Sequence, residues 1–101
     1  MAQIAMVVKL PAAEGRRDEL LAAAGKLVAA AEGEPGTVQY VAHTEQADPS
    51  AVWFYELYAD QAAFDAHSGS AAMAEAMATF GDLLAGDMEM HVLEIAHRKG
   101  G

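Results

Sequence analysis

Residues 34–67 constrain the fold more than any other part of the chain, because a turn, two strand-like runs and the start of a helix follow one another there. Residues 34–37 read Glu-Pro-Gly-Thr and place Pro and Gly at the two central positions of a turn, which fits type II. Residues 38–45 and 51–58 are rich in β-branched and aromatic residues. The connection between them contains Asp-Pro-Ser, so the two runs predict a β-hairpin.

Two further strands and two helices are expected around this hairpin. Apolar runs predict the strands, and apolar residues at helical spacing predict the helices. Asp60 and Ser70 can cap the two halves of a second helix that breaks between them. The order β-α-β-β-α-β predicts an α+β, ferredoxin-like fold, with a four-stranded antiparallel sheet and its helices on one face. These additional elements are expected at residues 3–10, 16–32, 61–67 with a continuation from 71 to about 86, and 88–96.

The strand at residues 51–58 carries apolar side chains on both of its faces. Trp53 and Tyr55 fall on one face, and Phe54 shares the other face with Glu56. A sheet with one face in water alternates apolar and polar residues, so both faces are expected to be covered. The helices cover one face, and a second copy of the chain is the simplest cover for the other. We therefore expect a homodimer.

Length, charge and cysteine content narrow the class of protein. The chain has 101 residues, and we expect a single domain over residues 1–101 with an ordered core at about 3–97. The formal net charge of −9 disfavours nucleic acid and anionic membranes as partners, and no apolar run reaches the length of a membrane span. Cysteine is absent, which excludes thiolate catalysis and Cys-based metal sites. A cytoplasmic location is expected.

Glu56 and His67 are the two candidate catalytic residues. Glu56 stands in the middle of an aromatic strand, where a buried carboxylate needs a partner or a raised pKa. It is interpreted as a general base or as the acceptor that orients a histidine, and the alternative is a structural hydrogen bond. His67 shares a helical face with Phe64 and can transfer protons near neutral pH. The alternative interpretation is structural: His67 is partly buried and hydrogen-bonded to the backbone.

Five residues are candidates for the wall of a substrate pocket. The aromatic ones could line a cavity for a flat ligand, and most of them could equally belong to the core. His91 could face the same pocket, although strand alternation alone does not place it. No expected helix carries His and Glu residues at the spacing typical of metal ligands, so a metal site has weak support. No phosphate-binding or dinucleotide-binding motif is present. The five candidates are Tyr40, Trp53, Tyr58, Met77 and His91.

The chain resembles the antibiotic biosynthesis monooxygenase family over nearly its whole length. The resemblance rests on a helix that ends in Glu-Pro-Gly, a strand with a Tyr, an Asp-Pro turn, a strand that ends in Glu-x-aromatic, and a capped helix that carries a His. The matching positions are Glu34 to Gly36, Tyr40, Asp48 and Pro49, Glu56 to Tyr58, Asp60, Ala62 to His67, and Ser70.

The resemblance implies a dimeric α+β barrel, in which two four-stranded sheets pack face to face, with a pocket between sheet and helices in each subunit. Relatives include oxygenases that oxidise phenols or quinols without metal or flavin, using a base and an apolar pocket. His67 and Glu56 match the recurrent His and Glu, and Tyr58 matches the aromatic residue after that Glu. Heme-degrading relatives differ at their key positions: the iron-binding position falls at Met77, and this chain has no asparagine.

Three hypotheses for the function follow. The leading one is a cofactor-independent monooxygenase that oxidises a small phenolic, hydroquinone or polyketide substrate with O₂. In this hypothesis His67 accepts a proton and Glu56 orients it. The second is a non-oxygenase on the same fold, either a small-molecule binding protein or an isomerase. The third is a structural dimerisation module without an active pocket.

Overall fold

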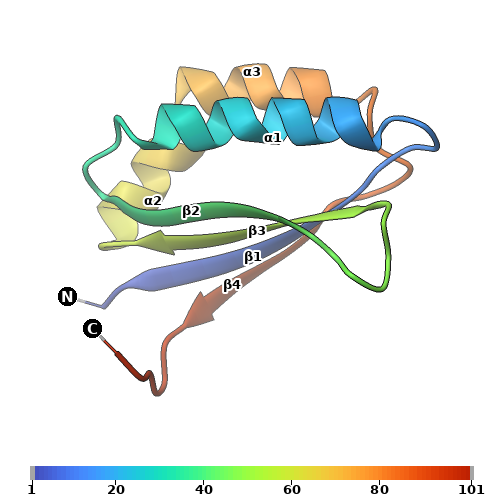
Figure 1. Ribbon diagram of the computed structural model, residues 1–101. Helices are drawn as coiled ribbons and strands as arrows, with labels where there is room; N and C mark the ends of the chain where they lie inside the picture. The colour runs from blue at the N-terminus through green and yellow to red at the C-terminus, as the bar shows by residue number, and fades with distance from the viewer. Residues whose placement is uncertain (1, 101) are drawn as a thin grey trace.

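The computed structural model describes residues 2–100, which form one four-stranded antiparallel sheet and three helices (Figure 1). The strand order is β2-β3-β1-β4, which is the ferredoxin-like arrangement expected from the sequence. Two short helices, α2 and α3, together take the place of the expected second helix. The elements are β1 (Ile4–Pro11), α1 (Arg17–Ala31), β2 (Thr37–Thr44), β3 (Ala51–Tyr58), α2 (Gln61–Ser68), α3 (Ala71–Phe80) and β4 (Glu89–Glu94).

Side-chain caps fix where α2 and α3 begin. The Asp60 carboxylate accepts a hydrogen bond from the Ala63 amide at 2.9 Å, and the Ser70 hydroxyl accepts one from the Met73 amide at 3.1 Å. Each cap satisfies an amide in the first turn of a helix that has no partner within that helix. Both capping residues were predicted from the sequence, and both are confirmed.

The α3 helix ends earlier than the sequence predicted, at Phe80 rather than near residue 86. The chain after it pairs with the end of β1: the Ala13 amide donates to the Leu83 carbonyl at 2.8 Å, and Leu84 forms an isolated bridge with Ala12. The helical spacing of the apolar residues had extended the helix to Leu84. Pairing with the backbone next to β1 gives these residues other hydrogen-bond partners, which helical periodicity cannot anticipate.

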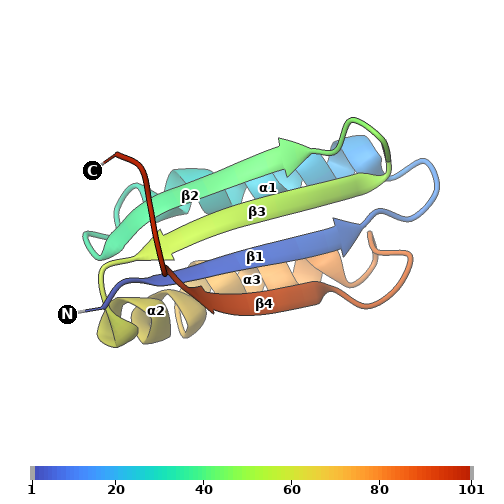
Figure 2. The same cartoon turned by 90° about the horizontal axis from the view of Figure 1, so that it is seen from below.

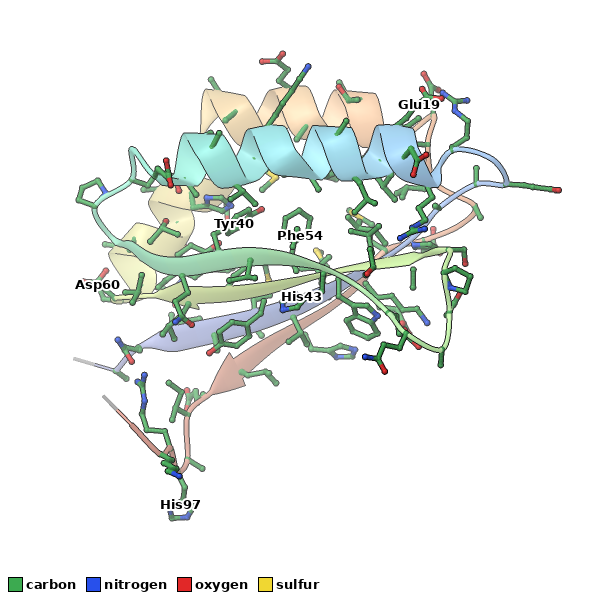
Figure 3. All side chains as sticks on the ribbon, in the orientation of Figure 1. Glu19, Tyr40, His43, Phe54, Asp60 and His97 are labelled. Carbon is green, nitrogen blue, oxygen red and sulfur yellow. The ribbon has the colours of Figure 1, made fainter. Side chains whose placement is uncertain are left out.

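All three helices lie on one face of the sheet, and α1 packs against α3 (Figure 1). Seen from below, the strands of the other face lie in front of the helices, and no described helix covers that face (Figure 2). We call these the helix face and the outer face. Alternate residues of β3 point to opposite faces: Phe54 and Glu56 point to the helix face, and Tyr55 to the outer face. The core lies between the helix face and the helices, and Figure 3 shows Tyr40 and Phe54 in this layer.

The outer face carries mostly apolar side chains in its middle row. Val41, Tyr55, Val7 and His91 lie side by side across β2, β3, β1 and β4. Val41 is 41% exposed, and no helix covers this row. The neighbouring row is more polar and includes Lys9, whose ammonium group lies 5.6 Å from the centre of the Trp53 ring. An apolar row of this kind on an uncovered face is suited to burial against another surface.

The Glu-Pro-Gly turn differs from the type II turn that the sequence predicted. Among residues 2–100, glycine has a positive φ only at positions 15 and 100, so Gly36 does not lie in the left-handed region. Glycine is needed at position 36 for another reason: a Cβ atom there would lie 2.5 Å from the Ala63 Cβ. The turn is therefore in close contact with the first turn of α2, and the Gly36 carbonyl also accepts a hydrogen bond from the Ala59 amide at 2.9 Å.

Candidate active site

Four polar or aromatic side chains meet on the helix face, where β2 and β3 pass under α2. Tyr40 on β2 is paired with Glu56 on β3, so their side chains point to the same face. Tyr58 follows Glu56 by two residues and shares that face. His67 approaches from the last turn of α2. We call Tyr40, Glu56, Tyr58 and His67 the polar cluster.

The His67 imidazole is held between two tyrosine rings. Its ring centroid lies 4.8 Å from that of Tyr40 and 5.4 Å from that of Tyr58. Only 3% of His67 is exposed, and it is the buried residue of α2. The Ser70 hydroxyl donates to the His67 carbonyl at 2.8 Å, which fixes the backbone at the junction between α2 and α3. The imidazole therefore lies between two tyrosine rings, next to the junction of α2 and α3.

The hydrogen-bond partner of His67 is Glu34, and not Glu56 as expected from the sequence. The Nδ1 atom of His67 lies 2.7 Å from Oε1 of Glu34, which stands in the turn before β2. The same oxygen accepts a hydrogen bond from the Thr37 hydroxyl at 2.8 Å. Glu34 is 24% exposed in its side chain, whereas the imidazole is buried. One carboxylate at the edge of the core thus orients the histidine inside it.

Glu56 has a different partner, because the Tyr58 hydroxyl donates a hydrogen bond to its carboxyl group. Burial raises the pKa of Glu56, and the hydrogen bond from Tyr58 and the nearby His67 offset part of that increase. Burial and the Glu56 charge raise the pKa of Tyr58. The neutral forms of Glu56 and Tyr58 are therefore favoured up to a higher pH than is ordinary for these groups. Glu56 and Tyr58 form one hydrogen-bonded pair, and Glu34 and His67 form another.

The second ring nitrogen of His67 has no hydrogen-bond partner. Nε2 is buried and makes no hydrogen bond to any atom of residues 2–100. A buried polar atom without a partner costs roughly 1–3 kcal/mol of stability, so native proteins contain few of them. Burial also raises the pKa of Tyr40, which flanks the same ring, and the charges of Glu56 and Glu34 add to that effect. The imidazole thus has one nitrogen bonded to Glu34 and one that is buried without a hydrogen-bond partner.

A sequence model of the antibiotic biosynthesis monooxygenase family matches residues 3–79, well over half of the chain. The chain belongs to this monooxygenase family. No curated protein matches it significantly.

Solved structures support the same fold assignment. Rv0793 from Mycobacterium tuberculosis has a TM-score of 0.91 at 21% identity, covering 98% of this chain and 100% of that one. SO0527 from Shewanella oneidensis has a TM-score of 0.89 at 25% identity, covering 93% and 91%. A proposed antibiotic biosynthesis monooxygenase from Chloroflexus aurantiacus has a TM-score of 0.81 at 26% identity, covering 98% of each chain.

Three of the candidate pocket residues lie outside the polar cluster of this monooxygenase family member. Trp53 is on the outer face, where its indole N–H donates to Glu45 at 2.7 Å. His91 is also on the outer face, opposite Val7. Met77 lies on α3 and is 43% exposed. The structure therefore brings Tyr40 and Tyr58 to the cluster and does not bring Trp53, His91 or Met77 there.

A row of apolar side chains leads from the polar cluster toward β4. Glu56 is paired with Met6 on β1, and Met6 is paired with Val92 on β4, so the three side chains lie in one row on the helix face. Val92 and its neighbour Met90 are 60% and 58% exposed, although they point to the same side as the core. The α3 helix lies over this part of the sheet (Figure 2). Met6 and Glu56 are buried, so only the β4 end of this row is exposed.

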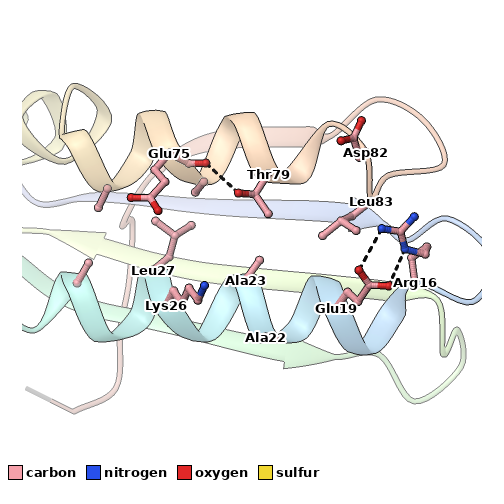
Figure 4. Close-up of a pocket in the computed structure, with 13 residues that line it drawn as sticks. Arg16, Glu19, Ala22, Ala23, Lys26, Leu27, Glu75, Thr79, Asp82 and Leu83 are labelled. Carbon is pink, nitrogen blue, oxygen red and sulfur yellow. Dashed lines mark hydrogen bonds and ion pairs between the residues drawn. The ribbon is translucent and has the colours of Figure 1, made fainter.

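A groove lies elsewhere, between α1 and α3 on the outside of the helix layer (Figure 4). Its volume is about 570 Å³, and alanine side chains form much of its floor. At one end Arg16 and Glu19 form an ion pair at 2.8 Å. No residue of the polar cluster lines this groove, so it does not give access to the cluster.

The described part of the chain contains neither a metal-ligand cluster nor a membrane-spanning helix. Within residues 2–100, no three His, Cys, Asp or Glu side chains are grouped as metal ligands would be. No helix in that part of the chain has the length and apolar character that crossing a bilayer requires.

Proposed function

We propose that this protein is a cofactor-independent monooxygenase that oxidises a small phenol, hydroquinone or polyketide with O₂. The observation that supports the proposal best is the buried imidazole of His67, which lies between two tyrosine rings with Nδ1 held by Glu34 and Nε2 without a hydrogen-bond partner. A base in an apolar, aromatic environment is what the removal of a phenolic proton requires. Membership of the family agrees with this reaction class.

In the proposed reaction, Nε2 of His67 removes the proton from the substrate hydroxyl group. The resulting anion is electron-rich and gives one electron to O₂, which produces a substrate radical and superoxide. The two radicals combine at a ring carbon and form a peroxide, and the His67 imidazolium returns the proton. Loss of water then leaves a carbonyl at that carbon. One oxygen atom enters the product and the other leaves as water, so no external reductant is needed.

Glu56 and Tyr58 serve a different role in this proposal. Because burial raises the pKa of Glu56, its neutral form can donate a hydrogen bond to a substrate oxygen. Tyr58 holds the carboxyl group in place through its own hydrogen bond. The substrate ring enters along the row that leads from Val92 over Met6 to Glu56.

The outer face supports a homodimer, which we include in the proposal. The apolar row formed by Val41, Tyr55, Val7 and His91 is uncovered in a single chain and would be buried between two facing sheets. Burial of this second surface would add to the core of a small protein.

Labelled oxygen tests the reaction directly. Purified protein is incubated with a panel of hydroquinones and phenols under ¹⁸O₂, while O₂ uptake is recorded. The proposal predicts uptake with at least one of these compounds, together with one ¹⁸O atom in the product and one in water. Binding of a compound without O₂ uptake, across a broad panel, would contradict it.

The second candidate is an isomerase, and one observation favours it. His67 can accept a proton and neutral Glu56 can donate one, and these two groups suffice to move a proton within an enolisable carbonyl compound. The two functions differ in their need for oxygen. Exchange of substrate hydrogen with solvent deuterium under anaerobic conditions would support the isomerase. Its absence, alongside turnover in air, would exclude it.

A further inference from the structure

Glu34 accepts two hydrogen bonds on a single oxygen atom. Its Oε1 atom is 2.8 Å from the Thr37 hydroxyl and 2.7 Å from Nδ1 of His67. An ionised carboxylate only accepts hydrogen bonds, so the proton between Glu34 and His67 belongs to Nδ1. A neutral imidazole carries one proton, and Nε2 then holds a free lone pair. The contact with Glu34 thus determines which nitrogen of His67 is basic.

The position of Glu34 is itself fixed by the turn that carries it. The Thr37 amide donates to the Glu34 carbonyl at 3.1 Å and closes the turn. Gly36 lies so close to Ala63 that any larger residue would collide with α2. The Gly36 carbonyl binds the Ala59 amide just before that helix. Because the turn is joined to the start of α2, the carboxylate and the imidazole keep a constant relative position.

No other described contact performs this function for His67. Glu56 interacts with the same imidazole electrostatically, but its carboxyl group accepts a hydrogen bond from Tyr58. Ser70 binds the His67 backbone carbonyl and leaves the ring free to rotate. Tyr40 and Tyr58 contact the ring only through their faces and edges. The rotation and the tautomer of the ring therefore depend on Glu34.

We propose that Glu34 is the positioning residue of the active site, which keeps the proton of neutral His67 on Nδ1 and leaves Nε2 as the proton acceptor. The role in catalysis rests on the proposed function, because it requires His67 to act as a base. The tautomer itself can be measured without any substrate. The two parts of the proposal can therefore fail separately.

Nitrogen-15 NMR of the histidine rings tests the first part. Wild-type His67, at a pH where its ring is neutral, is expected to carry its proton on Nδ1, with Nε2 unprotonated. Glu34→Leu removes the acceptor and should abolish this preference, whereas Glu34→Gln keeps an acceptor oxygen and should retain it. Glu32→Gln is the matched control, because Glu32 is exposed in the same connection and has no described side-chain hydrogen bond.

Two results would overturn the positioning role. One is a wild-type His67 that carries its proton on Nε2, and this result decides the question even when Glu34→Leu fails to fold. The other is a Glu34→Leu protein that is folded and retains the Nδ1 proton. Retention of that proton in Glu34→Gln together with its loss in Glu34→Leu would support the proposal.

Kinetics test the second part, on any substrate that the oxygen assay identifies. Glu34→Leu should lower kcat by roughly 10-fold to 100-fold and change KM little, because the substrate contacts remain while the base is misoriented. Glu32→Gln should leave both constants unchanged. A Glu34→Leu protein with an altered tautomer and an unchanged kcat would contradict the catalytic role. Absence of turnover in the wild type would contradict the proposed function and leave the tautomer result intact.

Discussion

The Tyr58 hydroxyl donates a hydrogen bond to the carboxyl group of Glu56, two residues earlier on β3, and both side chains are buried. The pair lies on the helix face beside His67 but is not the pair that orients this histidine. The active-site candidate therefore contains two separate hydrogen-bonded pairs. Each pair makes its own prediction for stability or for the pKa of a group.

Removal of the phenol tests the first pair. In Tyr58→Phe the buried Glu56 loses its hydrogen-bond donor, so the free energy of unfolding should fall by roughly 1–3 kcal/mol. The pKa of Glu56 should increase further, because the bond from Tyr58 now lowers it. Urea denaturation measures the first effect, and carboxyl NMR titration measures the second. Tyr55→Phe is the control, since Tyr55 lies on the outer face. A Glu56 that titrates identically in Tyr58→Phe would contradict the prediction.

The raised pKa of Glu56 makes stability depend on pH in a defined direction. In the unfolded chain the group titrates near its ordinary value of 4.5, and the folded protein holds the proton to higher pH. The contribution of Glu56 to stability is therefore present below pH 4.5 and is lost as the pH rises through the folded pKa. Glu56→Gln has no titratable group at this position, so its stability does not change with the protonation of residue 56. The unfolding free energy of the variant minus that of the wild type should therefore increase as the pH rises from 4.5 to the folded pKa of Glu56. A difference that stays constant between about pH 4 and pH 8 would contradict the raised pKa.

The contact between Gly36 and Ala63 predicts a rescue experiment. Gly36→Ala should reduce the unfolding free energy by roughly 1–3 kcal/mol, because the new methyl group overlaps the Ala63 side chain. Gly36→Ala combined with Ala63→Gly should recover much of the loss, and a double-mutant cycle measures this coupling. Gly25→Ala provides the control: nothing lies near its Cβ position in α1, so it should stabilise by about 0.5–1 kcal/mol. Additive effects of the first two substitutions would show that the turn is not held by this contact.

The outer face predicts the oligomeric state. Wild-type protein should sediment as a dimer, and Tyr55→Lys should yield monomers, because it places a charge in the middle of the apolar row. Ala29→Lys adds the same charge at an exposed position of α1 and should leave the dimer intact. Analytical ultracentrifugation distinguishes these cases. A wild-type monomer at micromolar concentration would contradict the proposed dimer.

Local signals in the sequence were sufficient to predict the fold. The order of strands and helices followed from periodicity, and the starts of α2 and α3 followed from Asp60 and Ser70, whose side chains cap amides three residues away. The end of α3 could not be predicted from local sequence signals. It depends on pairing between residues near Leu84 and the end of β1, which are distant in the sequence.

Part of the candidate site could be predicted, and part could not. The placement of Tyr40, Glu56 and Tyr58 on one face follows from strand alternation and the hairpin. The same alternation already separates Trp53 from Glu56, whereas His91 could be placed only once the register of β4 was known.

Glu34 was missed because it is 33 residues from His67 and stands in a turn that reads as purely structural. The available signal was a carboxylate followed three residues later by a hydroxyl side chain, in a turn next to a helix with a histidine.

Oxygen uptake by His67→Ala, compared with His43→Ala, tests the central claim most directly. His43 is an exposed histidine on β2 and lies outside the polar cluster, so it controls for the loss of an imidazole. With a hydroquinone that the wild type oxidises, the account predicts loss of most of the uptake rate in His67→Ala and an unchanged rate in His43→Ala. A folded His67→Ala protein that consumes O₂ at the wild-type rate would contradict it.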